Sequence, residues 1–178
     1  MDSINNSKSE DNHEDLSGKQ GRDKLKELIE KASSCFFCTN FRTGRPFTTR
    51  PMAVQNTDDE GNIWFLSSDE SHKNEEIMHD PLVQLLFQGS PHSDFLSVVG
   101  RAFVSKDKEK IEELWNPLLK TWFTGGVHDS RITVIKVIPD EGYYWDTKHA
   151  QAVAFVKRLV GAAIGKTIDD SIEGSITV

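Results

Sequence analysis

The chain has 178 residues, 37% of them hydrophobic, with a mean hydropathy of -0.49 and a formal net charge of -7. This size and composition predict one soluble domain with a sizeable core, and no apolar run approaches the roughly 20 residues that cross a bilayer. The negative charge argues against nucleic acid and against an anionic membrane surface as partners, because both attract basic proteins.

The chain begins with an acidic segment, residues 1–18, which is rich in Asn and Ser and nearly devoid of apolar side chains. We predict that it is disordered. It matches neither a secretory signal nor a transit peptide, so we expect a cytoplasmic protein. The folded domain is predicted over 19–165, with a loosely held tail at 166–178. At its start, the apolar spacing over 20–31 predicts an amphipathic helix.

Next comes an apolar and aromatic run, 33–40, which predicts a strand and contains Cys35 and Cys38. The C-F-F-C pattern is compatible with a redox dithiol or with half of a zinc site. However, residues three apart on a strand point to opposite faces, and the chain has no second cysteine pair to complete a metal site. We therefore predict two buried thiols and no metal.

The remaining elements follow from local patterns. Alternation bounded by turn residues predicts further strands at 46–56, 63–67, 82–88, 94–105, 131–138 and 143–145. Helical patterns predict helices at 71–79, from Asp107 to about residue 120, and at 149–163. Gly100 lies inside its strand and predicts a bulge, whereas 139–142 predicts a turn. Together they predict an α+β fold: six or seven mostly antiparallel strands in a small closed barrel, with peripheral helices.

One candidate binding segment lies at Arg50 and Pro51. Proline holds the preceding residue extended and cannot donate to a ladder, so this strand is predicted to be an edge or bulged. Its free backbone groups suit the hydrogen-bonding edge of a planar heterocycle. An edge proline that only prevents aggregation is an equally valid interpretation.

A second cluster lies between a strand end and a helix start, at Ser67, Ser68, Ser71, His72 and Lys73. Helix N-termini offer unpaired N–H groups and partial positive charge, which suit a phosphate. The alternative is that Ser71 caps the helix and Lys73 is a solvated surface charge. The chain shows no metal-ligand spacing, Gly-rich phosphate loop or hydrolytic triad.

The succession R-P-M, W-F-L-S-S, S-x-K, V-G-R-A, W-N-P, W-F and Y-Y-W-D resembles the general-stress branch of the pyridoxamine 5′-phosphate oxidase-like family. The likeness runs from about Asp23 to Trp145. It implies an FMN-binding split β-barrel that works as a homodimer, with flavin in two equivalent clefts at the interface.

The resemblance also implies roles for individual residues. The residues matched to flavin contacts lie on the predicted strands 46–56 and 63–67. They are Arg50, Pro51, Met52, Ala53, Leu66 and Ser67, with Ser68 beside them. Lys73 matches the phosphate-binding lysine, and His72 stands where the oxidase has an arginine. Trp145 matches a tryptophan brought by the second subunit, and Trp122 and Phe123 belong to an aromatic loop that lines the same cleft.

The chain departs from the oxidase at one place and from the general-stress branch at another. The Arg-x-His-Asp-Arg segment that binds pyridoxal phosphate is absent after Trp145, so we do not expect oxidation of pyridoxamine phosphate. Thr124 and Ser130 replace prolines of the aromatic loop. The leading hypothesis is an FMN-dependent oxidoreductase in which the cofactor supplies the redox chemistry and no catalytic residue is assigned. The alternative is a non-catalytic flavin-binding stress protein.

Overall fold

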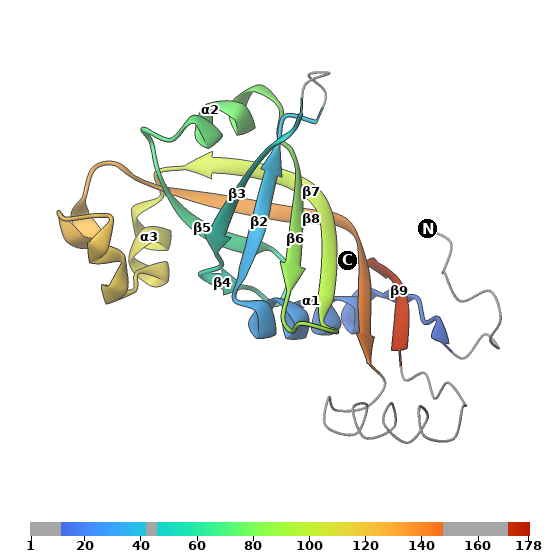
Figure 1. The fold of residues 1–178 in the computed structure, drawn as a ribbon. Helices are drawn as coiled ribbons and strands as arrows, with labels where there is room; N and C mark the ends of the chain where they lie inside the picture. Colours follow the sequence, from blue (N-terminus) through green and yellow to red (C-terminus); the bar gives the residue numbers. More distant parts are fainter. Residues whose placement is uncertain (1–11, 42–45, 148–170) are drawn as a thin grey trace.

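The computed structural model describes residues 12–41, 46–147 and 171–178 (Figure 1). Within these ranges the chain forms nine strands and three α-helices, besides two short 3-10 helices. In chain order the elements are β1 (Leu16–Ser17), α1 (Gly18–Ala32), β2 (Ser34–Thr39), β3 (Thr48–Ala53), β4 (Asn56–Thr57), β5 (Ile63–Ser68), α2 (His72–His79), β6 (Leu82–Gln88), β7 (Phe95–Ser105), α3 (Lys108–Leu114), η2 (Pro117–Thr121), η3 (Gly126–His128), β8 (Ile132–Thr147) and β9 (Ser171–Thr177). No helix of this part is long and apolar enough to span a membrane.

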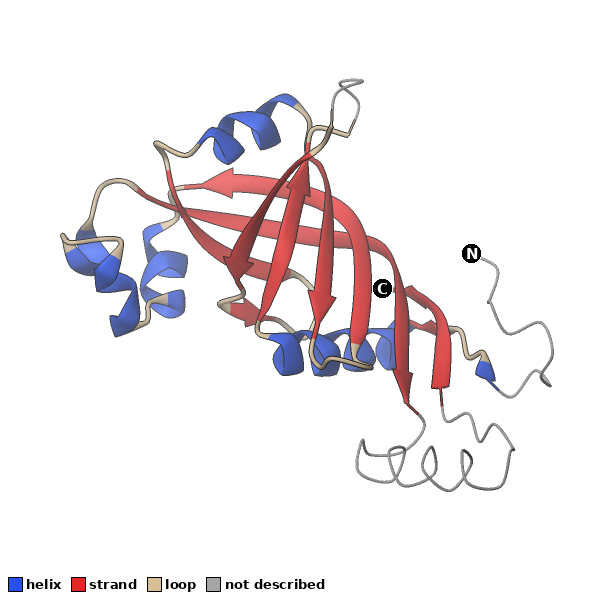
Figure 2. Ribbon diagram, viewed as in Figure 1, coloured by secondary structure: helices blue, strands red, loops and turns tan. Residues whose placement is uncertain are grey.

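The strands form a single sheet in the order β1-β9-β8-β7-β6-β2-β3 (Figure 2). Strand β9 pairs with the second half of β8, and β5 pairs with its first half. Every pair is antiparallel except β1 with β9, so the fold is α+β with a mixed sheet. Among the described residues no strand pairing joins β3 to β5; the chain passes from β3 into β4, and Gln55 N donates to Trp64 O at 2.9 Å. The closed barrel of six or seven strands is therefore not seen as a closed hydrogen-bonded ring.

Strand β8 is continuous over 16 residues, where the sequence predicted two strands and a turn at 139–142. Its partner β7 explains the difference, because the register shifts beside Gly100: Val99 pairs with Glu141 and Gly100 with Pro139. The extra residue, Asp140, is absorbed in the predicted bulge, where proline is tolerated. A Cβ on Gly100 would lie 2.4 Å from Ile138 O, so this crossing needs glycine.

Helices cover both ends of the sheet: α1 lies across the lower end in Figure 1 and α2 across the upper end of β2 and β3. Leu25, Leu28 and Ile29 of α1 are fully or almost fully buried in the main core. Helix α3 begins as predicted, with the Asp107 carboxylate accepting from Lys110 N. It ends at Leu114, earlier than predicted, because Pro117 holds Asn116 extended and starts a separate 3-10 helix.

The segment 171–177, predicted to be a loose tail, is strand β9 between β1 and β8. Its Ile176 is fully buried in the main core. The predicted disordered segment 1–18 also contains an ordered part, since Glu14 N donates to Glu173 O and Leu16 pairs with Ile176. Gly174 lies so close to Glu14 that a Cβ would be 1.8 Å from the Glu14 carbonyl oxygen. The predicted helix at 149–163 lies outside the described residues.

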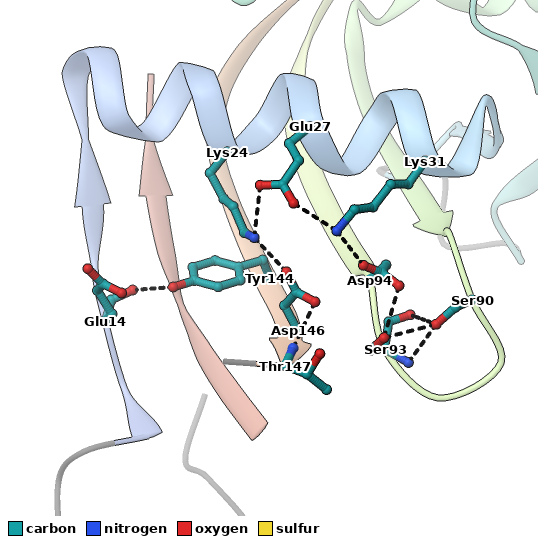
Figure 3. Close-up of polar contacts among 10 residues, drawn as sticks. All are labelled: Glu14, Lys24, Glu27, Lys31, Ser90, Ser93, Asp94, Tyr144, Asp146 and Thr147. Atoms are coloured by element: carbon teal, nitrogen blue, oxygen red, sulfur yellow. Dashed lines mark hydrogen bonds and ion pairs between the residues drawn. The ribbon is translucent and has the colours of Figure 1, made fainter. Parts of the chain in front are cut away.

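Buried polar groups fix α1 on the sheet (Figure 3). Lys24 forms an ion pair with Asp146 of β8, whose side chain is 5% exposed. Lys31 reaches Asp94, 4% exposed, at 2.8 Å. The Glu27 carboxylate contacts both lysines, with its oxygens 3.1 Å from Lys24 Nζ and 2.7 Å from Lys31 Nζ. The charges that α1 buries are therefore paired.

Cys35 and Cys38 are both buried and free, as predicted. Cys35 lies in the main core, and burial, with a smaller contribution from Cys38, raises the pKa of its thiol to about 12. The Cys38 sulfur lies 3.3 Å from Thr49 Oγ1.

Candidate functional site

The candidate site lies where β3, the end of β5 and the start of α2 meet. Arg50 of β3 donates from Nη2 to Glu76 Oε2 of α2 at 2.7 Å. Thr39 of β2 donates its hydroxyl to the same oxygen at 2.6 Å. Burial tends to raise the pKa of Glu76, but the hydrogen bonds from Thr39 and Arg50 outweigh it and hold the pKa below its ordinary value. Glu76 is therefore a fixed negative charge between two strands and a helix.

The second terminal nitrogen of Arg50, Nη1, is buried and has no hydrogen-bond partner among the described residues. Leaving a buried charged donor unpaired is costly, and guanidinium groups pair readily with carboxylate or phosphate. The site therefore fits a ligand that brings an anionic oxygen to Arg50.

A second positive charge stands beside Arg50. Lys73 of α2 donates from Nζ to Ser71 Oγ at 2.9 Å. Burial, and next the charge of Arg50, lower the pKa of Lys73 below its ordinary value, against an opposing effect of Glu76. The site thus contains two cations, Arg50 and Lys73, and one anion, Glu76. These three groups leave a local excess of positive charge in an acidic protein.

Ser67 is part of an internal polar network. Its hydroxyl, in a residue that is 3% exposed, donates to Asn74 Oδ1 at 3.2 Å. Asn74 in turn donates to Ser68 O at 3.0 Å and to Thr133 Oγ1 at 2.9 Å. The network holds the start of α2 against the ends of β5 and β8. His72, by contrast, has a side chain that is 92% exposed, and its Nδ1 lies 3.6 Å from Glu75 Oε2.

Strand β3 divides its predicted contact residues between two faces. Arg50 and Met52 alternate with the more exposed Pro51 and Ala53, and Met52 packs against the main core. Because β3 pairs with β2 alone among the strands of the described part of the chain, Pro51 lies on an edge strand, as predicted. Pro51 also lines an apolar groove of about 360 Å³, together with Ser34, Cys35, Phe36, Leu86, Phe87, Gln88 and Phe95.

The predicted aromatic residues lie in different places. Phe123 is buried beside Leu66 in a second core cluster under α3, whereas Trp122 is 68% exposed. Trp145 packs against Tyr143, with ring centroids 4.8 Å apart. Ser68 pairs with Ile132, and Trp145 lies 13 residues further along β8, about 40 Å at the rise of a strand. The described chain therefore does not bring its own Trp145 to Lys73.

Trp145 is also distant from Pro51 across the sheet. Residue pairing leads from Pro51 through Phe36, Leu86 and Ser97 to Tyr143, the neighbour of Trp145 on the same face. Those four strand spacings amount to about 19 Å.

Sequence reasoning missed three residues of the site: Thr39, Asn74 and Glu76. Only Glu76 carried a usable signal, because it follows Lys73 by three residues, the spacing of neighbours on one helix face. Thr39 and Asn74 are uncharged and reach their partners only through the fold.

Comparison with known proteins connects this geometry with a family. Among solved structures, a candidate general stress protein 26 from Jannaschia sp. CCS1 aligns with a TM-score of 0.73 and 22% identity, covering 90% of this chain and 100% of that one. A general stress FMN/FAD binding protein from Xanthomonas citri aligns with a TM-score of 0.58 and 22% identity, covering 68% of this chain and 84% of that one. At this identity the two likenesses show a shared fold.

Sequence comparison finds shorter matches. Protein bli-3 of Neurospora crassa is 32% identical over 98 residues, 50% of this chain and 47% of that protein. General stress protein 26 of Bacillus subtilis is 28% identical over 82 residues, 44% of this chain and 58% of that protein. The chain thus spans about half the length of the curated relatives it matches.

The family model described as pyridoxamine 5′-phosphate oxidase like matches residues 20–169, most of the chain. This range includes every predicted site residue from Arg50 to Trp145. The chain belongs to the pyridoxamine 5′-phosphate oxidase-like family, with general stress protein 26 among its relatives.

Proposed function

We propose that this protein binds FMN and acts as a flavin-dependent oxidoreductase of the general stress type, on a substrate other than pyridoxamine phosphate. The observation that carries the proposal is the buried Nη1 of Arg50, which stands beside Lys73 and has no hydrogen-bond partner within the described ranges. The Xanthomonas citri neighbour, described as an FMN/FAD binding protein, supports it.

The phosphate of FMN is the proposed ligand of the two cations. A phosphate monoester carries a charge of about -1.5 to -2 at neutral pH. Arg50 and Lys73 match that charge, although Glu76 offsets part of it. Bidentate or charge-assisted contacts from Arg50 Nη1 and Lys73 Nζ are the grip we propose.

The flavin ring is proposed to lie along β3, in contact with Pro51, Met52 and Ala53. An edge strand has backbone groups on its outer side that no further strand occupies, and these suit the polar edge of a heterocycle. The apolar groove beside Pro51 suits the flat body of the ring. The bound flavin supplies the redox chemistry, and the residues of the chain bind, orient and shield it.

We also propose that two copies form a split-barrel dimer with the flavin at their interface. Phe36 is 58% exposed and Leu86 38% exposed on the outer face of the sheet, where a second copy would cover them. Tyr143 of the same chain lies four strand spacings, about 19 Å along the sheet, from Pro51, and Trp145 is two residues further along β8. In a twofold dimer, Trp145 of the partner subunit would complete the cleft.

Titration with FMN tests the binding proposal. Purified protein is titrated with FMN and with riboflavin, followed by quenching of flavin fluorescence. We expect tighter binding of FMN, and a loss of at least about tenfold in FMN affinity in Lys73→Glu and Arg50→Glu, since each replaces attraction by repulsion. Lys19→Glu on the exposed side of α1 is the control. FMN binding that survives both site substitutions unchanged contradicts the proposal.

A non-catalytic flavin-binding role is the second candidate. The carboxylate of the site, Glu76, has a lowered pKa and two hydrogen bonds, so it is poorly suited to proton transfer at neutral pH. Oxidation of NADH or NADPH with a quinone acceptor separates the candidates. Turnover supports the oxidoreductase; a bound flavin that dithionite reduces but nicotinamides do not supports the binding role.

A further inference from the structure

Two donors from two different strands converge on one carboxylate oxygen of helix α2. Glu76 Oε2 of α2 accepts from Arg50 Nη2 of β3 at 2.7 Å and from Thr39 Oγ1 of β2 at 2.6 Å. Thr39 is fully buried, and the side chains of Arg50 and Glu76 are 21% and 18% exposed. The carboxylate is thus held in place from one side by Thr39 and holds Arg50 from the other.

This contact fixes the direction of the remaining Arg50 donors. A guanidinium is planar and rigid, so holding Nη2 sets the plane of the group and the direction of Nη1. Nη1 is the atom that is buried without a hydrogen-bond partner among the described residues. Glu76 therefore leaves one donor of Arg50 in a set position for an incoming anion.

We propose that Glu76 is a positioning residue that orients Arg50 toward the flavin phosphate and so makes the site select FMN over riboflavin. The inference rests on the proposed FMN binding and deepens it. Thr39 supports the same arrangement by fixing the Glu76 carboxylate. Neither residue touches the flavin; both act through Arg50.

The competing explanation is that Glu76 is only a counter-charge. An anion close to a phosphate repels it, so on charge alone the loss of Glu76 would tighten FMN binding. Positioning predicts the opposite result for Glu76→Ala, which leaves Arg50 free to rotate. The two explanations differ in the sign of the effect.

The test compares Kd values for FMN and riboflavin in Glu76→Ala, Glu76→Gln and Thr39→Val. We expect Glu76→Ala to weaken FMN about tenfold and riboflavin less than about twofold. Glu76→Gln keeps an oxygen that accepts from Arg50, so it retains most of the FMN affinity. Thr39→Val lowers FMN affinity in the same direction by a smaller factor. Glu75→Ala, whose side chain is 75% exposed on the same helix, is the matched control and changes neither Kd.

A double-mutant cycle shows whether Glu76 acts through Arg50. In an Arg50→Ala background, Glu76→Ala should cause no further loss of FMN affinity, because its target is gone. Circular dichroism and thermal melting verify the fold of each variant. If Glu76→Ala does not fold, Thr39→Val still decides, because it keeps the charge of Glu76: tighter FMN binding in Thr39→Val, or equal losses of FMN and riboflavin affinity, overturns the inference.

The outcomes separate this inference from the proposed function. Wild-type protein that ignores FMN, or binds riboflavin as tightly, contradicts the proposed function. Wild-type protein that prefers FMN, with an unchanged preference in Glu76→Ala, overturns only the positioning role. Equal weakening of both ligands by Glu76→Ala also overturns it, because a general structural loss has no reason to spare riboflavin.

Discussion

At the scale of single residues, the local surroundings of Lys73 determine how it can hold an anion. The amine is partly buried and stands beside Arg50, and both conditions disfavour its charged form. Its pKa is lowered from the value of an exposed lysine, so it loses its proton at a lower pH than lysines on the surface. Anion binding that depends on Lys73 must follow this titration.

FMN affinity is therefore expected to fall at alkaline pH, and to do so before exposed lysines titrate. The sign follows from the charge, because neutral Lys73 no longer attracts the phosphate. The measurement is the FMN Kd from pH 7 to pH 10. Lys73→Arg should flatten the alkaline fall. A wild-type profile as flat as that of Lys73→Arg would contradict this role of Lys73.

Sequence reasoning found Arg50 and Lys73 because each is marked locally, by the following proline and by the start of a helix. It could not find the partner of Arg50. Glu76 lies 26 residues away along the chain, and Thr39 lies 37 residues from Glu76. Their contact exists only because α2 crosses the ends of β2 and β3, an arrangement that no local pattern encodes.

At the scale of elements, the burial of α1 depends on charge pairing as well as apolar contact. Lys24 is 19% exposed and its partner Asp146 only 5%. Removing one member of such a pair leaves the other buried without compensation, which typically costs about 3–5 kcal/mol. A surface pair costs far less to break, at most about 1 kcal/mol.

We expect Lys24→Met to lower the free energy of unfolding by about 3 kcal/mol. Lys19→Met, on the same helix, breaks an exposed pair with Asp23 and should change it by less than about 1 kcal/mol. Urea denaturation followed by tryptophan fluorescence measures both. Equal effects in the two variants would show that the buried pair does not stabilise the docking of α1.

Most elements were predictable, and the two main errors share a cause. Residues 139–142 carry the composition of a turn, but pairing with β7 and the bulge at Gly100 keep β8 extended through them. Strand β9 has few apolar residues, and its pairing partners β1 and β8 are distant in sequence. In both places contacts remote along the chain override the local preference.

At the scale of the whole molecule, the outer face of the sheet leaves apolar side chains exposed. Phe36 and Leu86 are paired neighbours there and line the groove beside Pro51. If this face joins two copies, a charge at its centre should separate them, because an unpaired buried charge is strongly unfavourable.

Phe36→Lys is expected to convert a dimer into monomers and to weaken FMN binding, since the partner's Trp145 is lost from the cleft. Light scattering coupled to size exclusion gives the mass, and fluorescence titration gives the Kd. Phe103→Lys, 51% exposed on β7 outside the groove, is the control. A wild-type monomer that binds FMN fully would refute the role of the second subunit.

The overall α+β class and its antiparallel character were predictable from alternation and turns. Whether the sheet closes into a barrel was not predictable, because closure depends on how the first and last strands meet. Here β3 ends at Ala53 and the chain continues through Val54 and Gln55 to β4, which pairs with β5. Periodicity predicts that a strand exists but does not reveal its neighbour.

The reaction of the two cysteines with a thiol reagent can report on the stability of this core. Both lie on β2, which is hydrogen-bonded on one side to β3 and on the other to β6. Burial blocks access to a bulky maleimide dye, and a pKa of about 12 keeps Cys35 protonated at pH 8. The native protein should therefore resist the dye, and the slow rate at which it reacts should report how often strand β2 opens. Mass spectrometry against time would register two additions on denaturation, without any engineered label.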